Sequence, residues 1–186
     1  KKFLPLALKR QPWNKYNLKE KEYCLVTMHR PSNVDSSDGI NNLIKILNSV
    51  SNEIDIIFPV HPRTMFAIKK AKLSLNKKIM LYEPLSYLDF LGLMHSACLV
   101  FTDSGGIQEE TTYLKVPCIT FRDNTERPIT IDVGTNHLIG TSPSEALKAI
   151  KKNIKNKVKQ SQIPKKWDGN TAARIVDIIN SRFDLS

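Results

Sequence analysis

Short apolar runs alternate with segments of helical spacing along most of the chain. The runs are residues 23–28 (YCLVTM), 55–60 (DIIFPV), 79–83 (IMLYE), 98–103 (CLVFTD), 117–122 (PCITFR) and 137–140 (HLIG). Their length and their β-branched and aromatic residues predict six buried strands. Between the strands, apolar residues recur at helical spacing, as at Ile40, Leu43, Ile44 and Leu47, and at Leu88, Leu91, Leu93 and Met94.

Strands that alternate with helices over short connections form βαβ units. The right-handed crossovers of such units produce a parallel sheet with helices on both faces. The nearly continuous apolar character of the strands agrees with burial on both faces. The pattern therefore predicts an α/β fold, a doubly wound, Rossmann-like parallel sheet of about six strands.

The chain is long enough for one domain and short for two, with 186 residues and a hydrophobic content of 41%. Residues 1–22, with Pro5 and Pro12, have the character of an interdomain linker or lead-in segment. Residues 23–186 are predicted to form the Rossmann-like domain, which closes with an amphipathic helix over residues 170–183 (NTAARIVDIINSRF). We therefore expect one half of a larger enzyme.

The formal net charge of +10 raises the question of a nucleic-acid partner. Lysines concentrate in the first two dozen residues and in a second segment, a helix that Ser142 and Pro143 begin by cap and first-turn chemistry. The lysines of that helix spread around the helical wheel with few aromatics between them: Lys148, Lys151, Lys152, Lys155, Lys157 and Lys159. Such a pattern is typical of a solvated helix face, and we expect no nucleic acid to bind.

The remaining composition points to a cytoplasmic protein. No stretch approaches the roughly 20 uninterrupted apolar residues of a membrane span, and the apolar run in residues 1–13 is too short for a signal peptide. Cys24, Cys98 and Cys118 lie in apolar runs without metal-ligand spacing, which predicts buried free thiols. We expect no membrane contact, no metal and no cofactor.

Polar side chains follow the predicted strands at the edge where a ligand would bind. In open parallel α/β sheets, ligands bind beyond the carboxyl ends of the strands. The first five strands end in THRPSN, HPRT, EPLSY, DSGG and RDNTERP. Every one of these ends supplies a His, Arg, Ser, Asp or Glu, which favours a functional site there over five unrelated capping residues.

The DSGG turn predicts an anion site. Gly105 and Gly106 allow a ligand oxygen to approach backbone N–H groups that a Cβ would shield. The first turn of a helix has unpaired N–H donors and about half a positive charge, which suits a phosphate or diphosphate. Ser104 could donate its hydroxyl to the same anion. Ser-Gly-Gly turns also serve simply as helix starts, so the pattern alone leaves both interpretations open.

Glu109 and Glu110 follow in the same predicted helix and have two possible roles. Carboxylates in a first turn stabilise the helix dipole by roughly 0.3 to 1 kcal/mol. Alternatively, one of them binds the ribose hydroxyls of a nucleotide, as the acidic residue of dinucleotide sites does.

Four motifs together resemble a known family: VTMHRPSNVD, FPVHPRT, TDSGGIQEE and VPCITFRDNTERPITIDVGTNHLIG. In this order they resemble the non-hydrolysing UDP-N-acetylglucosamine 2-epimerases, from about Tyr23 to the end of the chain. Glycosyltransferases with two Rossmann-like domains share only the glutamate-bearing turn, and hydrolysing epimerases lack the RDNTERP to VGTN run. The resemblance implies a two-domain, GT-B-type architecture of which this chain is the C-terminal half, and UDP-N-acetylglucosamine as the ligand. For the full-length protein we expect a homodimer.

The resemblance assigns UDP-binding roles to five residues. Ser104, Gly105 and Gly106 are similar to the diphosphate cradle of the family, and Glu110 is similar to the glutamate that holds the ribose hydroxyls. Phe90 resembles the aromatic residue that packs near the uracil, although its position is equally compatible with a helix core.

The resemblance also implies catalytic roles. His29 and Arg127 match residues that face the diphosphate and the reacting sugar, with Glu126 beside them. His29 could instead only cap its loop. Arg122 is the weakest candidate, because it could simply pair with a neighbouring aspartate, Asp103 or Asp123.

Arg30 and His61 match positions that contact a second, allosteric UDP-N-acetylglucosamine in bacterial relatives. Here the usual HRREN loop is changed, because Pro31 and Ser32 replace an Arg and a Glu. This departure puts allosteric activation in doubt but leaves nucleotide binding unaffected.

The reaction of the family eliminates UDP to a glycal and adds it back with inverted C2. The predicted site meets the need to stabilise departing UDP, because a helix N-terminus and Arg127 can hold its charge. It lacks an evident base for the C2 proton, because the carboxylates of the family's acid/base chemistry belong to the N-terminal domain. Glu126 is the only local candidate, and Arg122 and Arg127 should hold it in ion pairs. Alternatives are a stand-alone nucleotide-sugar binding module and the donor half of a GT-B glycosyltransferase.

Overall fold

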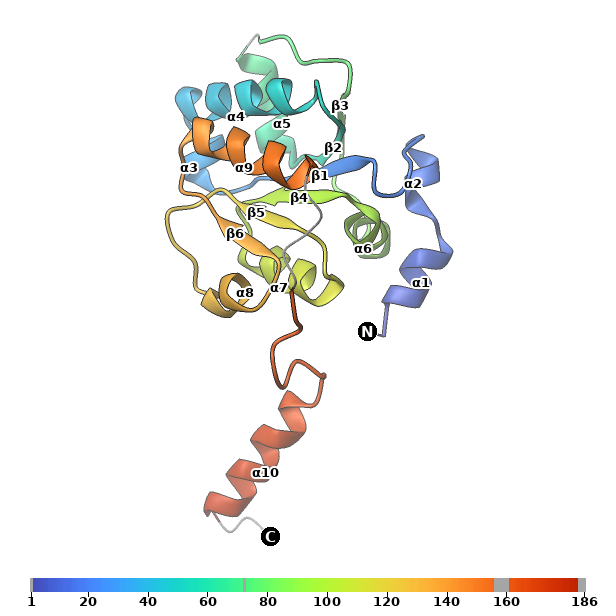
Figure 1. Ribbon diagram of the computed structural model, residues 1–186, viewed down its shortest axis with the longest axis vertical. Helices are drawn as coiled ribbons and strands as arrows, with labels where there is room; N and C mark the ends of the chain where they lie inside the picture. The colour runs from blue at the N-terminus through green and yellow to red at the C-terminus, as the bar shows by residue number, and fades with distance from the viewer. Residues whose placement is uncertain (1, 72, 156–160, 184–186) are drawn as a thin grey trace.

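The computed structural model describes residues 2–71, 73–155 and 161–183. Its centre is a sheet of six parallel strands in the order β3-β2-β1-β4-β5-β6 (Figure 1). The strands are β1 (Tyr23–Thr27), β2 (Asp55–Pro59), β3 (Ile79–Tyr82), β4 (Leu99–Thr102), β5 (Cys118–Thr120) and β6 (Asn136–Leu138). Each overlaps the apolar run that predicted it, so the doubly wound, Rossmann-like class is confirmed.

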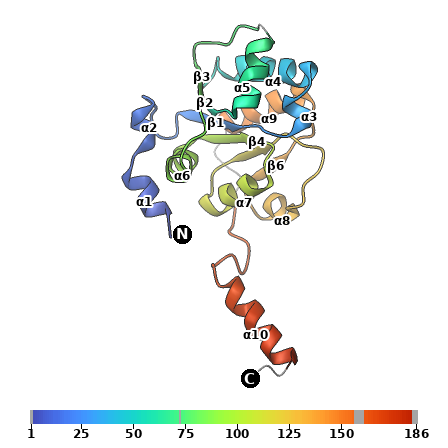
Figure 2. The same ribbon diagram turned by 180° about the vertical axis from the view of Figure 1, so that it is seen from behind.

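Helices cover both faces of the sheet (Figures 1 and 2). One face carries α3 (Pro31–Val34), α4 (Ser37–Val50), α5 (Pro62–Lys70) and α9 (Pro143–Lys155). The opposite face carries α6 (Tyr87–Ser96), α7 (Gly105–Leu114) and α8 (Pro128–Asp132), with α1 (Leu4–Lys9) and α2 (Pro12–Lys15) beside α6. The last helix, α10 (Thr171–Phe183), extends away from both layers.

The strand side chains divide between two hydrophobic cores, because successive residues of a strand point to opposite faces. In β1, Cys24 and Val26 join the core under α4 and α9, whereas Tyr23 and Leu25 join the core under α6. The four apolar residues that predicted α4 are all buried in the first core. Of the cysteines, Cys24 and Cys118 are buried free thiols as predicted, whereas Cys98 is only partly buried.

The lead-in segment before β1 is helical and contributes to the second core. Ala7, Trp13 and Tyr16 are buried there, on α1 and α2 and directly after α2. Gly92 of α6 permits this close approach, because a Cβ at Gly92 would lie 2.7 Å from Pro12 Cγ and 3.0 Å from the Ala7 carbonyl oxygen. The first 22 residues therefore hold the outer side of α6 in place.

The surface of α9 agrees with the prediction of a solvated, lysine-bearing face. Ala146 and Ile150 are buried, and exposed Lys148 pairs with Glu145 one turn away. Of the lysines predicted on this helix, Lys157, Lys159 and the side chain of Lys155 lie outside the described residues.

The helix α10 is amphipathic as predicted, but none of its residues is buried. Its exposed large apolar side chains are Ile175, Val176, Ile178, Ile179 and Phe183. No helix in the described part of the chain has both the length and the apolar character needed to cross a membrane.

The packing of α6 gives a stability test. We expect Gly92→Ala to destabilise the protein by about 1 to 3 kcal/mol, because the added methyl group meets a proline ring and a backbone oxygen that cannot give way easily. Chemical denaturation measures the change, and limited proteolysis should show faster cleavage in residues 1–22.

The matched control is Gly106→Ala, since no described atom lies within 4 Å of that Cβ position. Alanine is the better helix former by roughly 0.5 to 1 kcal/mol, so this variant should be at least as stable as the wild type. Equal stability of Gly92→Ala and Gly106→Ala would contradict the proposed packing of α1 and α2 on α6.

Candidate functional site

The strand order reverses between β1 and β4, which are neighbours in the sheet. In open parallel sheets the crevice at such a reversal, beyond the carboxyl ends of the strands, is the common ligand site. The loop after β1 carries His29 and Arg30, and the turn after β4 carries Asp103 and Ser104. Two of the predicted motifs therefore meet at the position where a ligand is expected.

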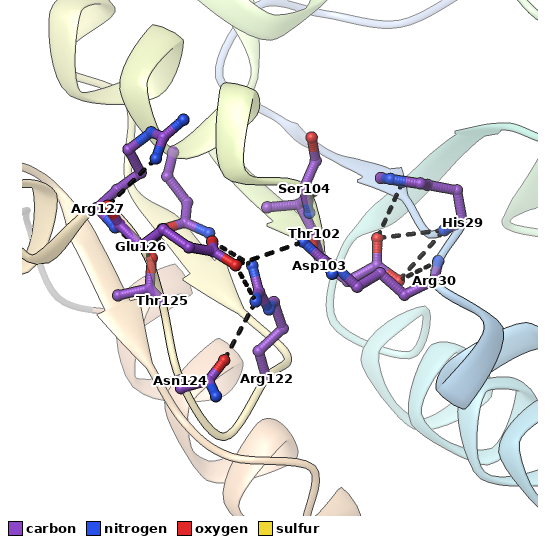
Figure 3. A network of polar contacts seen from close by, with 11 residues as sticks. His29, Arg30, Thr102, Asp103, Ser104, Arg122, Asn124, Thr125, Glu126 and Arg127 are labelled. Atoms are coloured by element: carbon purple, nitrogen blue, oxygen red, sulfur yellow. Dashed lines mark hydrogen bonds and ion pairs between the residues drawn. The ribbon is translucent and has the colours of Figure 1, made fainter.

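The buried carboxylate of Asp103 joins the two loops (Figure 3). It accepts hydrogen bonds from the backbone N–H of His29 at 3.1 Å, the backbone N–H of Arg30 at 2.9 Å and the Asn33 amide at 3.0 Å. The Nδ1 atom of His29 lies 3.1 Å from the same carboxylate, and Arg30 Nε donates to the Asp103 carbonyl oxygen. A buried charge needs such partners, and here they fix the path of the β1–α3 loop.

Arg122 pairs with Glu126 rather than with Asp103 or Asp123. Its guanidinium donates to both Glu126 carboxylate oxygens, at 2.8 and 3.0 Å, and also to Asn124 Oδ1. These hydrogen bonds lower the pKa of Glu126 to about 2, with smaller contributions from the charges of Arg122 and Arg30. Glu126 is therefore an ionised partner of arginine, as predicted for its pair with Arg122.

Arg127 lies beside Glu126 but pairs with a different carboxylate. Its Nε atom is 2.8 Å from Glu109 Oε1, while its Nη1 donates to the backbone oxygen of Glu126. The expectation that Arg127 pairs with the Glu126 carboxylate is thus wrong. The pair with Glu109 also changes the interpretation of that residue: α7 begins at Gly105, so Glu109 lies beyond the first turn, where the dipole contribution falls off.

A buried polar network holds the loop that presents Glu126 and Arg127. Gln108 Oε1 accepts hydrogen bonds from Thr125 Oγ1 at 2.6 Å and from Asn136 Nδ2 at 3.1 Å. Thr125 Oγ1 in turn accepts the backbone N–H of Arg127. Sequence analysis missed Gln108 and Asn136, although a glutamine on a packed helix and an asparagine at a strand end are signals of buried hydrogen bonding.

The N-terminus of α7 is open to a ligand. The Ser104 side chain makes no capping hydrogen bond, and its backbone N–H donates to Thr102 Oγ1. Neither Gly105 nor Gly106 has a positive φ, and a Cβ on Gly106 would have no described atom within 4 Å. Backbone conformation and internal packing therefore do not require glycine at Gly106, which leaves close approach of a ligand as a physical reason for it.

Glu110 lies one turn further along α7, at a cavity of about 440 Å³. Tyr87 of α6, Tyr113 of α7 and Trp167 are among the other lining residues. Glu110 Oε2 is buried and has no hydrogen-bond partner among the described residues. Burial, with the charge of Glu109 second, raises the pKa of the Glu110 carboxyl above its ordinary value. A hydroxyl donor from a ligand would satisfy this oxygen.

Two predicted residues lie apart from this cluster. Phe90 is half-buried on α6 and packs on the second core, while Tyr87 and Leu91 of the same helix line the cavity. His61 precedes α5, and its Nδ1 accepts the backbone N–H of Arg63 at 3.3 Å as a cap. The structure instead places Arg30, predicted to share a second site with His61, within 4.0 Å of Glu126.

The raised pKa of Glu110 has a consequence for stability. The folded state binds this proton more tightly than the unfolded state does, so the carboxyl lowers stability as pH rises above its ordinary pKa of 4.5. We expect Glu110→Gln to be more stable than the wild type at pH 7, with the difference shrinking toward zero near pH 4.

Denaturant unfolding at a series of pH values measures this difference. The control is Glu145→Gln, which removes an exposed carboxylate on α9; its pair with exposed Lys148 contributes little to stability, so the pH dependence should stay close to that of the wild type. A wild type whose stability relative to Glu110→Gln rises between pH 4 and pH 7 would contradict the assignment of a buried, unpaired carboxylate.

Comparison with known proteins identifies the family of the chain. The family profile described as UDP-N-acetylglucosamine 2-epimerase matches residues 4–180. The UDP-N-acetylglucosamine 2-epimerase of Methanococcus maripaludis is 41% identical over 172 residues, which are 87% of this chain and 45% of that protein. The enzyme of the same name from Methanocaldococcus jannaschii is 43% identical over 164 residues, or 85% and 44%.

A solved structure gives the same result. The Methanocaldococcus jannaschii UDP-GlcNAc 2-epimerase in complex with UDP-GlcNAc and UDP matches with a TM-score of 0.80 at 39% identity, over 97% of this chain and 51% of that chain. The chain thus spans about half the length of the relatives it matches. It belongs to the UDP-N-acetylglucosamine 2-epimerase family.

Proposed function

We propose that this chain is the UDP-sugar-binding, C-terminal domain of a UDP-N-acetylglucosamine 2-epimerase. In this proposal the complete enzyme converts UDP-N-acetylglucosamine to UDP-N-acetylmannosamine by eliminating UDP and adding it back. Residues 23–186 are the UDP-binding domain, and residues 1–22 lead into it from an N-terminal domain. The observation that carries the proposal is the open N-terminus of α7 at the reversal of strand order, with cationic side chains beside it.

The diphosphate of UDP would bind at Ser104, Gly105 and Gly106. The N-terminal N–H groups of α7 supply donors and the positive end of the helix dipole, and the Ser104 hydroxyl is not used as a cap. The ribose hydroxyls would then reach Glu110, whose buried oxygen needs a donor. The uracil of UDP would lie toward α6, the helix that carries Phe90 and Tyr87.

The departing UDP carries negative charge that this site is suited to stabilise. His29 and Arg30 approach from the loop after β1, and Arg122 and Arg127 from the loop after β5 (Figure 3). Each side chain is already held by a carboxylate or by backbone, so little reorganisation is needed when charge develops. Preorganised donors of this kind are typically worth about 2.7 to 4 kcal/mol each. We accordingly assign Arg30 to this site and leave only His61 as a candidate for a second nucleotide.

The base for the C2 proton would come from outside this chain. A general base works best with a pKa near the working pH, whereas Arg122 holds the pKa of Glu126 at about 2. Glu126 therefore serves to orient Arg122 and Arg30 in our proposal. The acid/base carboxylates would belong to the N-terminal half that the relatives have in addition.

We infer that the N-terminal domain also covers α10. This helix buries none of its residues and exposes five large apolar side chains, an arrangement that needs a partner surface.

The free, mostly buried cysteines fit a reducing compartment, which supports a cytoplasmic enzyme. The full-length protein would form a homodimer, which its mass in solution would test.

The UDP site gives a binding test. Titration calorimetry should detect UDP binding to the chain, and Ser104→Ala should weaken it by about 1 to 3 kcal/mol through loss of a hydrogen bond to a charged group. Gly106→Ala should weaken it as well, because the methyl group stands between the ligand and the N–H groups, even though the variant remains folded.

The control for both variants is Glu145→Gln, on α9, a helix on the opposite face of the sheet from α7 (Figure 1), which should bind UDP as the wild type does. If Ser104→Ala and Gly106→Ala both bound UDP with wild-type affinity, the result would contradict the proposed diphosphate site.

The division of the active site gives a second test. The chain alone should not exchange the C2 proton of UDP-N-acetylglucosamine with solvent deuterium, because the described residues beside the proposed diphosphate site include no carboxylate suited to act as the base. Together with an N-terminal domain it should epimerise, and Arg127→Ala should then lower kcat more than it raises KM, because its contact strengthens as charge develops.

Deuterium at C2 after incubation with the chain alone would show that the base is in this domain. Binding of UDP without any turnover in the reconstituted protein would favour a binding module over an epimerase.

A further inference from the structure

We propose that Asp103 is a positioning residue that fixes His29 as the Nδ1–H tautomer and thereby presents Nε2 to the ligand. This inference deepens the proposed function and rests on it, since the ligand is the diphosphate proposed at the N-terminus of α7. The geometry that leads to it is the contact between a buried carboxylate and one nitrogen of a half-exposed imidazole.

The hydrogen bonds of Asp103 determine which nitrogen of His29 bears a proton. Three N–H donors already reach the two carboxylate oxygens, from His29, Arg30 and Asn33. A carboxylate that receives three donors acts as an acceptor toward a fourth nitrogen as well. The Nδ1 atom of His29, 3.1 Å from Oδ1, must then carry the hydrogen between them.

The fold makes this contact rigid. Asp103 directly follows β4 and His29 lies two residues after β1, and the two strands are hydrogen-bonded neighbours. The carboxylate is fully buried, whereas 55% of the His29 side chain is exposed. Water therefore does not compete for the oxygen that Nδ1 contacts, and the exposed part of the ring is left for the ligand.

The orientation of the ring decides what His29 can do. With Nδ1 on Asp103, Nε2 is the only ring nitrogen left for a ligand, because the two nitrogens point in different directions and the hydrogen bond of one sets the role of the other. Figure 3 shows the imidazole above the Asp103 carboxylate, on the side of Ser104. When the ring is protonated, Nε2–H can donate to a diphosphate oxygen while Nδ1–H stays on Asp103. The same orientation lets Nε2 accept a proton when the ring is neutral.

The test measures the tautomer directly. Two-bond ¹H–¹⁵N spectra of the protein with ¹⁵N-labelled histidine distinguish Nδ1–H from Nε2–H, and the signals of His29 are assigned by their loss in His29→Gln. We expect neutral His29 to be the Nδ1–H tautomer in the wild type. In Asp103→Asn, the amide can turn its NH₂ toward Nδ1, so His29 should change to the Nε2–H tautomer.

The control variant is Asn33→Ala. Asn33 is buried and also holds Asp103, but its amide donates to Asp103 Oδ2 and to the Phe121 carbonyl oxygen, not to the imidazole. It should leave the tautomer unchanged, so a change of tautomer in Asp103→Asn but not in Asn33→Ala separates the specific effect from a loosened loop.

The outcomes are distinguishable from those that bear on the proposed function. An Nε2–H tautomer in the wild type would overturn the inference, and this measurement is valid even where Asp103→Asn does not fold. An equal change of tautomer in Asn33→Ala would overturn it too. Because the tautomer is measured without UDP, an Nδ1–H wild type supports the inference about Asp103 and His29. Absence of UDP binding in the same sample would instead overturn the proposed function.

Discussion

The burial of one carboxylate at the point where the strand order reverses is the constraint on which the site depends. At that point the loops after β1 and β4 diverge to opposite faces of the sheet, toward α3 and α7. Asp103 lies between them, and a charge in that position is tolerated only if donors surround it. The donors come from the β1–α3 loop, so satisfying the charge also fixes the loop. One physical requirement thus positions His29, Arg30 and the start of α7 together.

The arginines of the site are also held by oppositely charged partners, and these pairs differ in how deeply they are buried. Arg122 is nearly buried and has a bidentate partner in Glu126, whereas the pair of Arg127 and Glu109 is about half exposed. Exposed ion pairs contribute little to stability, so the second pair is better explained by orientation than by folding. A diphosphate that arrives at α7 would meet arginines whose side-chain freedom is already reduced, and the entropy lost on binding would be smaller.

The sequence predicted the fold well because the fold depends on local periodicity. Runs of apolar residues give the six strands, and the spacing of residues such as Leu43 and Leu47 gives the helices. The ends of the strands also indicated where polar side chains gather. What the sequence could not predict are pairings between residues far apart in the chain. Asp103 was considered only as a possible partner of Arg122, yet its partners lie 70 to 74 residues earlier.

The same limit explains the error at Arg127 and the omission of Gln108. Adjacent residues in a sequence suggest a pair, but Arg127 is the N-cap residue of α8 and its side chain reaches Glu109 on α7. Likewise, Gln108 occupies a helix position whose burial follows only from the packing of α7 against the loop before α8. Helical spacing alone does not distinguish an exposed glutamine from one that organises a network. The burial of residues in the lead-in segment could not be predicted either, because it depends on the close approach of α1 and α2 to Gly92.

The charges of the site indicate which half of a reaction this domain can support. A site that removes a proton from carbon needs a base whose pKa is raised toward neutrality, usually by burial without a cationic partner. Here the carboxylate with a raised pKa is Glu110, beyond the first turn of α7 and facing the cavity, while the carboxylate among the cations, Glu126, has a pKa lowered to about 2. The surroundings of α7 therefore support the proposed binding of an anion and of hydroxyl groups. Proton abstraction requires a carboxylate in a different environment, and in our proposal it comes from the N-terminal half that the relatives, about twice the length of this chain, have in addition.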